Sequence, residues 1–434
     1  MNVLDIIAKK RDKKELSKEE IEFFVQGYTK GEITDYQAAA LVMAIYLNGM
    51  TNNEITNLTI AMAYSGEVLD LSKLGENVVD KHSTGGIGDK VTLILMPIIA
   101  ALGVPVAKMS GRGLGFTGGT IDKLESIPGY NTQISVDEFI ENVEKIGISL
   151  MGQTLNLAPA DKKLYALRDS ISCVENIPLI ASSIMSKKIA SGANKIVLEV
   201  TVGNGAFMKN IDDAKKLAET MINIGKLAGK ETVCILTNMD EPLGYSIGNS
   251  LEVIEAVEAL QGDIEDDVKQ VVLELGSYMI KLAGKGDDIE ENKQRMLECL
   301  DSGLAYMKFL ELIENQGGDV SYINDVSKFE NAKFVYPVLA DKSGYIKNIK
   351  SQQLGKISCE LGAGRIKKDD IIDNQVGIII NKKIGDKVEK GEILGIIHSN
   401  DEEKLKNVIS EFKECFEMCD EFVEKAKVIL GICQ

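Results

Sequence analysis

Histidine is scarce in this sequence of 434 residues, which contains only His82 and His398. Two histidines exclude a histidine-rich metal site. The seven cysteines are odd in number, widely spaced and without a CxxC pair, so the sequence predicts neither a disulfide framework nor a zinc ribbon. We therefore expect reduced thiols and a cytoplasmic protein.

Basic residues are also in deficit, because 49 Lys and Arg against 66 Asp and Glu give a formal net charge of −17. This balance argues against nucleic acid or an anionic membrane as a partner. The longest uncharged stretch, residues 91–107, is too short to span a bilayer and contains two prolines, so it predicts a buried helix followed by a strand. The N-terminal sequence MNVLDIIAKKRDKKE carries charges where a signal peptide needs an apolar core.

The length is about three times that of a typical domain, which predicts two or three domains. The first 65 residues are predicted to be helical, with capping boxes that begin at Ser17, Thr34 and Thr51. After Val78, short apolar runs alternate with helical segments, a pattern typical of a sheet covered by helices. The expected strands lie in residues 78–80, 104–109, 148–153, 195–200 and 232–238.

Residues 159–193 interrupt this alternation with helical sequence, so the helical domain is expected to be discontinuous. The chain is helical again from 265 to about 316 and changes to strands after Gly317. Part of this last region resembles the hammerhead half-barrel of biotinyl and lipoyl carriers, but it lacks their modified lysine, which favours a structural role.

We expect an α/β protein with a small helical domain, a larger α/β domain with a mostly parallel central sheet, and a C-terminal α+β domain containing a β-hammerhead. The predicted boundaries are 1–66 with 159–193, 67–158 with 194–316, and 317–434.

Two glycine-rich stretches follow predicted strands, DKHSTGGIGDK at 80–90 and KMSGRGLGFTGGT at 108–120. Each is rich in hydroxyl groups and in backbone N–H groups that are free to converge on an anion at a helix N-terminus. Neither stretch ends in the Gly-Lys-Ser or Gly-Lys-Thr of a Walker nucleotide-binding loop. Either one alone is equally well a tight turn. Two such loops after two strands of one parallel sheet would meet at the carboxyl ends of the strands, which predicts a phosphate site.

A third group lies in the helical stretch that ends at Lys187 and Lys188, where Ser183 and Lys187 share one helix face. Such a face is more often exposed to solvent than functional. Here the intervening residues are apolar, which favours the wall of a polar cleft.

Six motifs resemble, in the right order, those of the family of pyrimidine nucleoside phosphorylases and thymidine phosphorylases. They are the segment from Ser110 to Glu125 and the sequences KHSTGGIGD, ADKKLYALRD, IPLIASSIMSKK, GAFMK and PLGYSIGN. The resemblance covers essentially the whole chain. It implies a homodimer that carries out reversible phosphorolysis, in which phosphate attacks the anomeric carbon of a pyrimidine nucleoside and releases the base and a pentose 1-phosphate. No organic cofactor is implied, and inorganic phosphate is the co-substrate.

The resemblance also implies roles for individual residues. Phosphate would be held by Lys81, Ser83, Thr92, Ser110 and Thr120, with Lys108 nearby. The base would be held by Arg168, Ser183 and Lys187, and His82 would hydrogen-bond or protonate its 2-carbonyl oxygen. His398 is expected to be structural. Because thymidine-specific relatives have Met in place of Lys108, we expect activity on uridine as well as thymidine and deoxyuridine.

Several positions depart from the family pattern. Related bacterial enzymes bind a potassium ion at the positions of Gly88, Lys90, Leu243, Ser246 and Glu255, but they usually have Thr in place of Lys90. The lysine could swing away or its ammonium could take the place of the ion, and we favour a weakened or replaced site. The family usually has His, Asp and Lys at three positions that are here Phe116, Glu199 and Thr201. These departures bear on the fine tuning of activity and not on the class of reaction.

Three alternatives stay open at this point. The first is a phosphorylase specific for thymidine. The second is a phosphoribosyltransferase of the anthranilate type, which shares a Thr-Gly-Gly loop but needs an acidic pair for magnesium, and we find no convincing motif for one. The third is a nucleoside-binding protein without catalysis.

Overall fold

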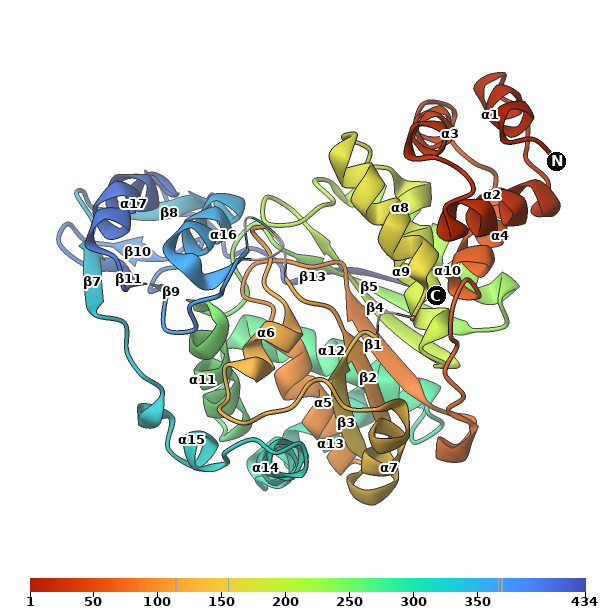
Figure 1. Ribbon diagram of the computed structural model, residues 1–434. Coiled ribbons are helices and arrows are strands. Elements are labelled where there is room, and N and C mark those ends of the chain that lie inside the picture. The colour runs from red at the N-terminus through yellow and green to blue at the C-terminus, as the bar shows by residue number, and fades with distance from the viewer. Residues whose placement is uncertain (114, 155, 366, 368–369) are drawn as a thin grey trace.

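The computed structural model describes residues 1–113, 115–154, 156–365, 367 and 370–434. Its N-terminal part is a helical layer, at the upper right of Figure 1. The helices of this layer are α1 (Val3–Arg11), α2 (Lys18–Lys30), α3 (Asp35–Asn48), α4 (Asn52–Ala63), α8 (Pro159–Ser170) and α9 (Ile177–Ala190). The capping boxes at Ser17 and Thr51 are present. Leu164 and Leu179 share one core with Ile21 and Leu41, so α8 and α9 pack against the first helices.

The central sheet has the order β1-β4-β5-β13, in which β1 (Val79–Ser83), β4 (Lys195–Val202) and β5 (Glu231–Asn238) run parallel. The last strand, β13 (Ile429–Cys433), pairs antiparallel with β5. Strands β2 (Val106–Ser110) and β3 (Ile148–Gly152) form a separate parallel pair. The expectation that both glycine-rich loops follow strands of one hydrogen-bonded sheet is therefore wrong, because the first loop follows β1 and the second follows β2. A ladder between β1 and β2 is absent from the described residues.

Helices cover these strands on both sides (Figure 1). They are α5 (Val91–Ala101), α6 (Thr120–Glu125), α7 (Val136–Ile146), α10 (Ile211–Leu227), α11 (Asn249–Leu260), α12 (Asp266–Leu282), α13 (Ile289–Asp301) and α14 (Leu304–Asn315). A short 3-10 turn spans Ser72–Leu74. All residues of α5 from Val91 to Ala100 are buried, because this almost wholly apolar helix lies inside the largest core.

The C-terminal part combines strands and helices. Its elements are α15 (Ser321–Asn324), a 3-10 turn (Val326–Lys328), β7 (Phe334–Leu339), β8 (Gly344–Ile349), α16 (Ser351–Ser358), a π-helical turn (Cys359–Ala363), β9 (Gly377–Ile380), β10 (Lys387–Val388), β11 (Ile393–Ser399), α17 (Glu402–Glu414) and β12 (Phe416–Cys419). One sheet has the order β10-β8-β12. The other has the order β6-β9-β11-β7 and takes β6 (Ser246–Ile247) from the loop after β5. Neither sheet closes into a barrel over the described residues.

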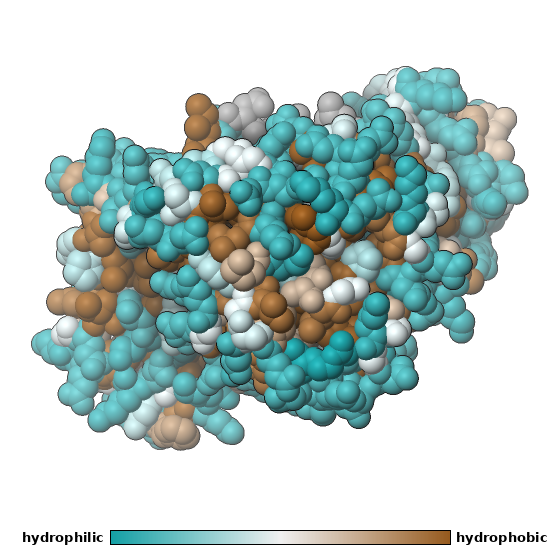
Figure 2. Space-filling view, turned by 90° about the horizontal axis from the view of Figure 1, so that it is seen from below, coloured by the Kyte–Doolittle hydropathy of each residue, from teal (hydrophilic) through white to brown (hydrophobic). Residues whose placement is uncertain are grey.

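Figure 2 shows the face seen from below, where hydrophilic residues cover much of the surface and hydrophobic residues gather across the middle. Most large apolar side chains lie instead in three buried cores. Among the described helices, none has the length and apolar character needed to cross a membrane. The structure thus has a helical part, an α/β part and a C-terminal α+β part, as the fold class predicts. The exact domain boundaries given above stay a prediction.

Candidate active site

The two glycine-rich loops and the helices α8 and α9 enclose a cavity of about 310 Å³. Nine of the residues singled out from the sequence line it. They are His82, Ser83, Thr92, Lys108, Ser110, Thr120, Arg168, Ser183 and Lys187. The cavity therefore lies between the helical part and the α/β part, with the loops on one side and α8 and α9 on the other.

The first loop, residues 83–90, lies at the end of β1 and leads into α5. The hydroxyl groups of Thr84 and Thr201 lie 2.9 Å apart, and the Thr201 backbone N–H donates to the Thr84 hydroxyl at 3.0 Å. Thr201 thus fixes the loop to β4 through neutral hydrogen bonds. A Cβ atom at Gly86 would lie 2.4 Å from the Cε atom of Met239, so a larger residue there would require the Met239 side chain to move. Thr92, in the first turn of α5, lines the cavity, and a helix N-terminus is favourable for an anion.

Lys81 lies beneath the cavity rather than on its wall. Its ammonium forms an ion pair of 2.8 Å with Glu199 and lies 3.9 Å from Asp89, and its side chain is 1% exposed. Burial alone would lower the pKa of Lys81, but Asp89 and Glu199 raise it above its usual value. In this structure Lys81 therefore places a buried positive charge beneath the first glycine-rich loop. Glu199, with one methylene more than the usual Asp, makes the contact with it.

Lys108 lines the cavity from β2 and lies 3.4 Å from Asp80. Asp80 also pairs with Lys188 at 2.6 Å. Burial lowers the pKa of Lys108 to about 7. Asp80 opposes this shift, whereas the positive charges of Lys188 and Lys81 add to it. Its charge therefore changes near neutral pH.

His82 is half-buried at the end of β1, among four lysines. Burial lowers its pKa well below the usual value, and the positive charges of Lys188, Lys108, Lys187 and Lys81 lower it further. The imidazole is consequently neutral at pH 7. A neutral imidazole can donate one N–H to a carbonyl oxygen, whereas protonating that oxygen would first require a proton from elsewhere.

The opposite wall comes from α8 and α9. The Lys187 ammonium contacts Asp161 at 2.8 Å and the Ser183 hydroxyl at 3.1 Å, so the four-residue spacing does place both groups on one face. That face lines the cavity rather than solvent. Arg168 is buried and donates to three backbone carbonyls, those of Cys173, Val174 and Leu179. These bonds fix the guanidinium and leave other N–H groups for a ligand.

The side chain of Lys90 lies where the family resemblance implies a potassium ion. Its ammonium lies 2.6 Å from the Leu243 carbonyl, 3.2 Å from the Ser246 carbonyl and 2.9 Å from the Glu255 carboxylate. These are three of the positions at which an ion would be bound, and the ammonium is fully buried among them. The residues present therefore do not fit a potassium ion. No cluster of three or more His, Cys, Asp or Glu suited to a metal occurs in the part of the chain that the structure describes.

Sequence reasoning missed the acidic partners of the cationic residues. Asp80 pairs with Lys108 and Lys188, and Asp161 holds Lys187. Asp161 and the lining residue Tyr165 both lie in the ADKKLYALRD motif, so their spacing from Arg168 on one helix was the available signal. Phe116 contacts the ring of Phe207 at 5.9 Å between centroids, and Phe207 lines the cavity.

Three family models match the chain. They are the helical bundle domain of the glycosyl transferase family at residues 4–66, its a/b domain at residues 75–306, and the pyrimidine nucleoside phosphorylase C-terminal domain at residues 345–418. The first two models place the chain in a class of glycosyl transferases.

Full-length relatives narrow this class. The chain is 52% identical over 418 residues to the pyrimidine-nucleoside phosphorylase of Staphylococcus haemolyticus, with 96% of each chain covered. It is 51% identical to that of Geobacillus stearothermophilus and 52% identical to that of Bacillus subtilis, with 93% of each chain covered in both comparisons. The chain belongs to the pyrimidine-nucleoside phosphorylase family.

The anthranilate phosphoribosyltransferase of Thermus thermophilus has a similar structure, with a TM-score of 0.60. The match covers 73% of this chain and 99% of that one at 19% identity. At this identity the likeness shows a shared fold.

Proposed function

We propose that the protein catalyses the reversible phosphorolysis of pyrimidine nucleosides, releasing the base and a pentose 1-phosphate. The observation that carries this proposal is the single cavity that joins two anion-binding loops to the Arg168, Ser183 and Lys187 wall. Support also comes from the pyrimidine-nucleoside phosphorylases that match the chain over almost its full length.

In this mechanism phosphate is already an ionised nucleophile, so the enzyme has to position it and stabilise charge rather than activate it. Ser83, Ser110 and Thr120 hold it between the loops, and Lys81 contributes positive charge from below. As the glycosidic bond breaks, negative charge develops on the pyrimidine. Arg168 and Lys187 stabilise that charge, and His82 donates a hydrogen bond to the 2-carbonyl oxygen.

The test is phosphate-dependent release of uracil from uridine by the purified protein. His82→Ala and Lys187→Ala are expected to lower kcat/KM by roughly 10²- to 10⁴-fold, the range for losing a group that acts on the transition state. Lys382→Met, a change outside the cavity, is the matched control and should leave the rate unchanged. Cleavage that needs no phosphate, or no cleavage by a folded protein, would refute the proposal. A chelator should have no effect, whereas loss of activity would favour a magnesium-dependent transferase.

We also propose that Lys108 widens the substrate range from thymidine and deoxyuridine to uridine, by donating a hydrogen bond to the ribose 2′-hydroxyl that only uridine has among these three. Its position on the cavity wall supports this role. Because the pKa of Lys108 is about 7, the ammonium is lost as pH rises through 7. The ratio of kcat/KM for uridine to that for thymidine should therefore fall from about pH 6 to about pH 8.

Lys108→Met should lower this ratio and make it independent of pH over the same range. Steady-state assays with both nucleosides measure it. A ratio that is the same in the variant and the wild type would rule out the proposed role of Lys108.

Three further properties belong to this proposal. We propose that the enzyme needs no potassium ion, since the Lys90 ammonium is bound by the carbonyls and carboxylate that would hold one. We propose a homodimer, supported by exposed apolar side chains on α1 and α3. A cytoplasmic location is supported by the seven free thiols.

A further inference from the structure

The loop between β5 and α11, residues 239–248, supports the first glycine-rich loop from below. The Leu243 N–H donates to the Ile87 carbonyl at 3.0 Å, and the Ile87 N–H donates to the sulfur of Met239 at 3.4 Å. A Cβ atom at Gly88 would lie 2.5 Å from the Leu243 carbonyl oxygen. Because the two loops are in such close contact, a displacement of Leu243 must displace the phosphate-binding loop as well.

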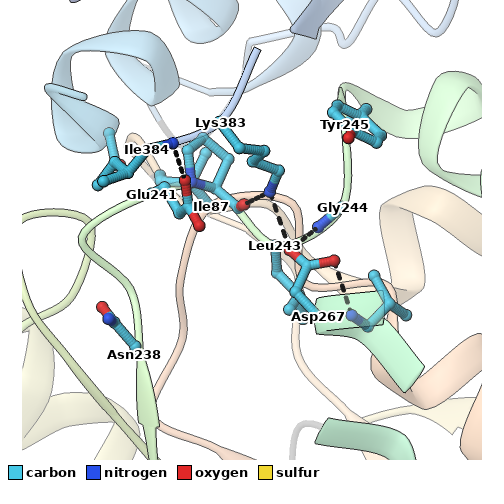
Figure 3. Close-up of polar contacts among 12 residues, drawn as sticks. Ile87, Asn238, Glu241, Leu243, Gly244, Tyr245, Asp267, Lys383 and Ile384 are labelled. Atoms are coloured by element: carbon cyan, nitrogen blue, oxygen red, sulfur yellow. Dashed lines mark hydrogen bonds and ion pairs between the residues drawn. The ribbon is translucent and has the colours of Figure 1, made fainter. Parts of the chain in front are cut away.

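The C-terminal part holds this supporting loop from the other side (Figure 3). The turn after β9 carries Lys383, whose ammonium donates to the Pro242 carbonyl and forms an ion pair of 2.8 Å with Asp267. The Ile384 N–H donates to the Glu241 carboxylate at 2.7 Å. Lys383 therefore contacts the supporting loop directly, although it lies about 140 residues further along the chain.

Asp267 extends this contact to the middle of the loop. The carboxylate oxygen that pairs with Lys383 also accepts from the Gly244 N–H at 3.0 Å, and the second oxygen accepts from the Val268 N–H at 2.8 Å. The Lys383 side chain is 9% exposed. Burial raises the pKa of Glu241, and Lys383 opposes that rise. Removing Lys383 would leave two acidic groups in a poorly solvated place without their cation.

We propose that Lys383 is a positioning residue for phosphate binding, which sets the phosphate-binding loop 83–90 through the supporting loop 239–248. The proposal rests on the proposed phosphorolysis. The base-binding groups Arg168, Ser183 and Lys187 lie on α8 and α9, at the other wall of the cavity. His82, which faces the base in the proposed mechanism, lies within β1 and is held by the ladder to β4 rather than by the supporting loop. The effect of Lys383 should consequently fall on phosphate and spare the nucleoside.

The experiment uses the full-length protein with Lys383→Met and measures kcat and the KM values for phosphate and uridine. We expect the KM for phosphate to rise about tenfold, which is within the range for a small misplacement of a binding group. The KM for uridine should stay within about twofold of the wild type. Lys383→Arg should restore most of the phosphate affinity, because it keeps a cation next to Asp267.

Lys382→Met is the matched control. Lys382 is the neighbouring residue, but its ammonium pairs with Glu392 inside the C-terminal part, so this variant should keep the wild-type KM for phosphate. If Lys383→Met does not fold, Asp267→Asn takes its place. This change removes the ion pair, keeps an acceptor for the Gly244 N–H, and should raise the KM for phosphate in the same direction by a smaller factor.

Two outcomes would overturn the inference. One is an equal rise in both KM values, and the other is a lower thermal midpoint with the KM for phosphate unchanged. Both require a wild-type enzyme that cleaves uridine with phosphate. A wild type without that activity would instead refute the proposed function itself.

Discussion

The Lys90 ammonium lies among the groups at which the family resemblance implies a potassium ion. Its ammonium contacts two carbonyls and the carboxylate of Glu255, which also accepts from the backbone N–H groups of Tyr245 and Ser246. Positive charge at this point therefore holds the loop that supports the active site. A tethered ammonium supplies that charge without loss of an ion to solvent.

The wild type should accordingly show the same activity in potassium chloride and in choline chloride at equal ionic strength. Lys90→Thr removes the ammonium and leaves oxygen groups that suit an alkali cation. We expect this variant to be several-fold less active in choline chloride and to recover in potassium chloride. Strong activation of the wild type by potassium would contradict the proposal, and so would a variant that does not respond to potassium.

His398 is the second residue whose environment has a measurable consequence. It is buried in β11, and within the described part of the chain neither ring nitrogen has a hydrogen-bond partner. Burial lowers its pKa below the usual 6.5, so the folded protein holds the neutral ring. The unfolded chain then binds a proton more readily than the folded one below pH 6.5, and stability is lost as pH falls through this range.

His398→Phe removes this proton uptake. We expect the thermal midpoint of the wild type to fall more between about pH 7 and about pH 5 than that of the variant. The corresponding loss in free energy of unfolding is at most about 1.4 kcal/mol for each unit by which the pKa is lowered. Calorimetry at the two pH values measures the difference. Parallel losses in both proteins would mean that another group controls the acid response.

Prediction from sequence succeeded best for residues inside local motifs. The hydroxyl and cationic groups near the cavity were found because they follow strands or share a helix face. The resemblance implies that Lys81 holds phosphate, and this role stays a prediction; the structure pairs the Lys81 ammonium with Glu199 beneath the loop. The direction of that side chain depends on a partner more than 100 residues away, which a local pattern does not reveal.

At the scale of elements, the five strands β1 to β5 lie close to the apolar runs that predicted them. Their pairing was harder to predict, because β1 and β2 belong to separate ladders. Strand β13 was missed altogether. Its short sequence VILGIC follows an acidic, irregular segment, and only pairing with β5 makes it a strand.

Strand β13 covers an edge of the central sheet. In its register Cys433 lies opposite Cys234 and Ile429 opposite Thr237. A chain that ends after Lys427 would expose the edge of β5, and exposed edges favour association between molecules. We expect the truncated protein to unfold several degrees below the full chain and to aggregate on heating.

Differential scanning calorimetry and light scattering provide the measurement. Ile432→Ser is the matched control, because Ile432 is 40% exposed and its backbone pairing is kept. This control should unfold within a degree or two of the wild type. A truncated chain with an unchanged midpoint would show that β13 adds little to the sheet.

At the scale of the whole molecule, the proposed homodimer needs an interaction surface. Helices α1 and α3 lie side by side at one end of the molecule (Figure 1) and expose several apolar side chains. Tyr36 is 75% exposed and Leu47 is 72% exposed. Apolar groups gathered on one face are typical of an interaction surface.

We therefore expect sedimentation equilibrium to give the mass of a dimer for the wild type. A double change, Tyr36→Asp with Leu47→Asp, places two charges on the proposed interface and should give monomers. Leu304→Asp is the control, since Leu304 is 57% exposed on the distant helix α14 and should leave the dimer intact. Dimers of the double variant would exclude α1 and α3 as the interface.

The sequence alone determined the fold class, the family resemblance and the residue types available for chemistry. These properties depend on periodicity, capping and local motifs, which each short segment carries by itself. Tertiary structure decided which of the cationic residues face the cavity, where Lys90 places its charge, and that Lys383 reaches the loop below the phosphate site. Each of these depends on contacts between residues far apart in the chain, and their geometry is fixed only when the elements pack together.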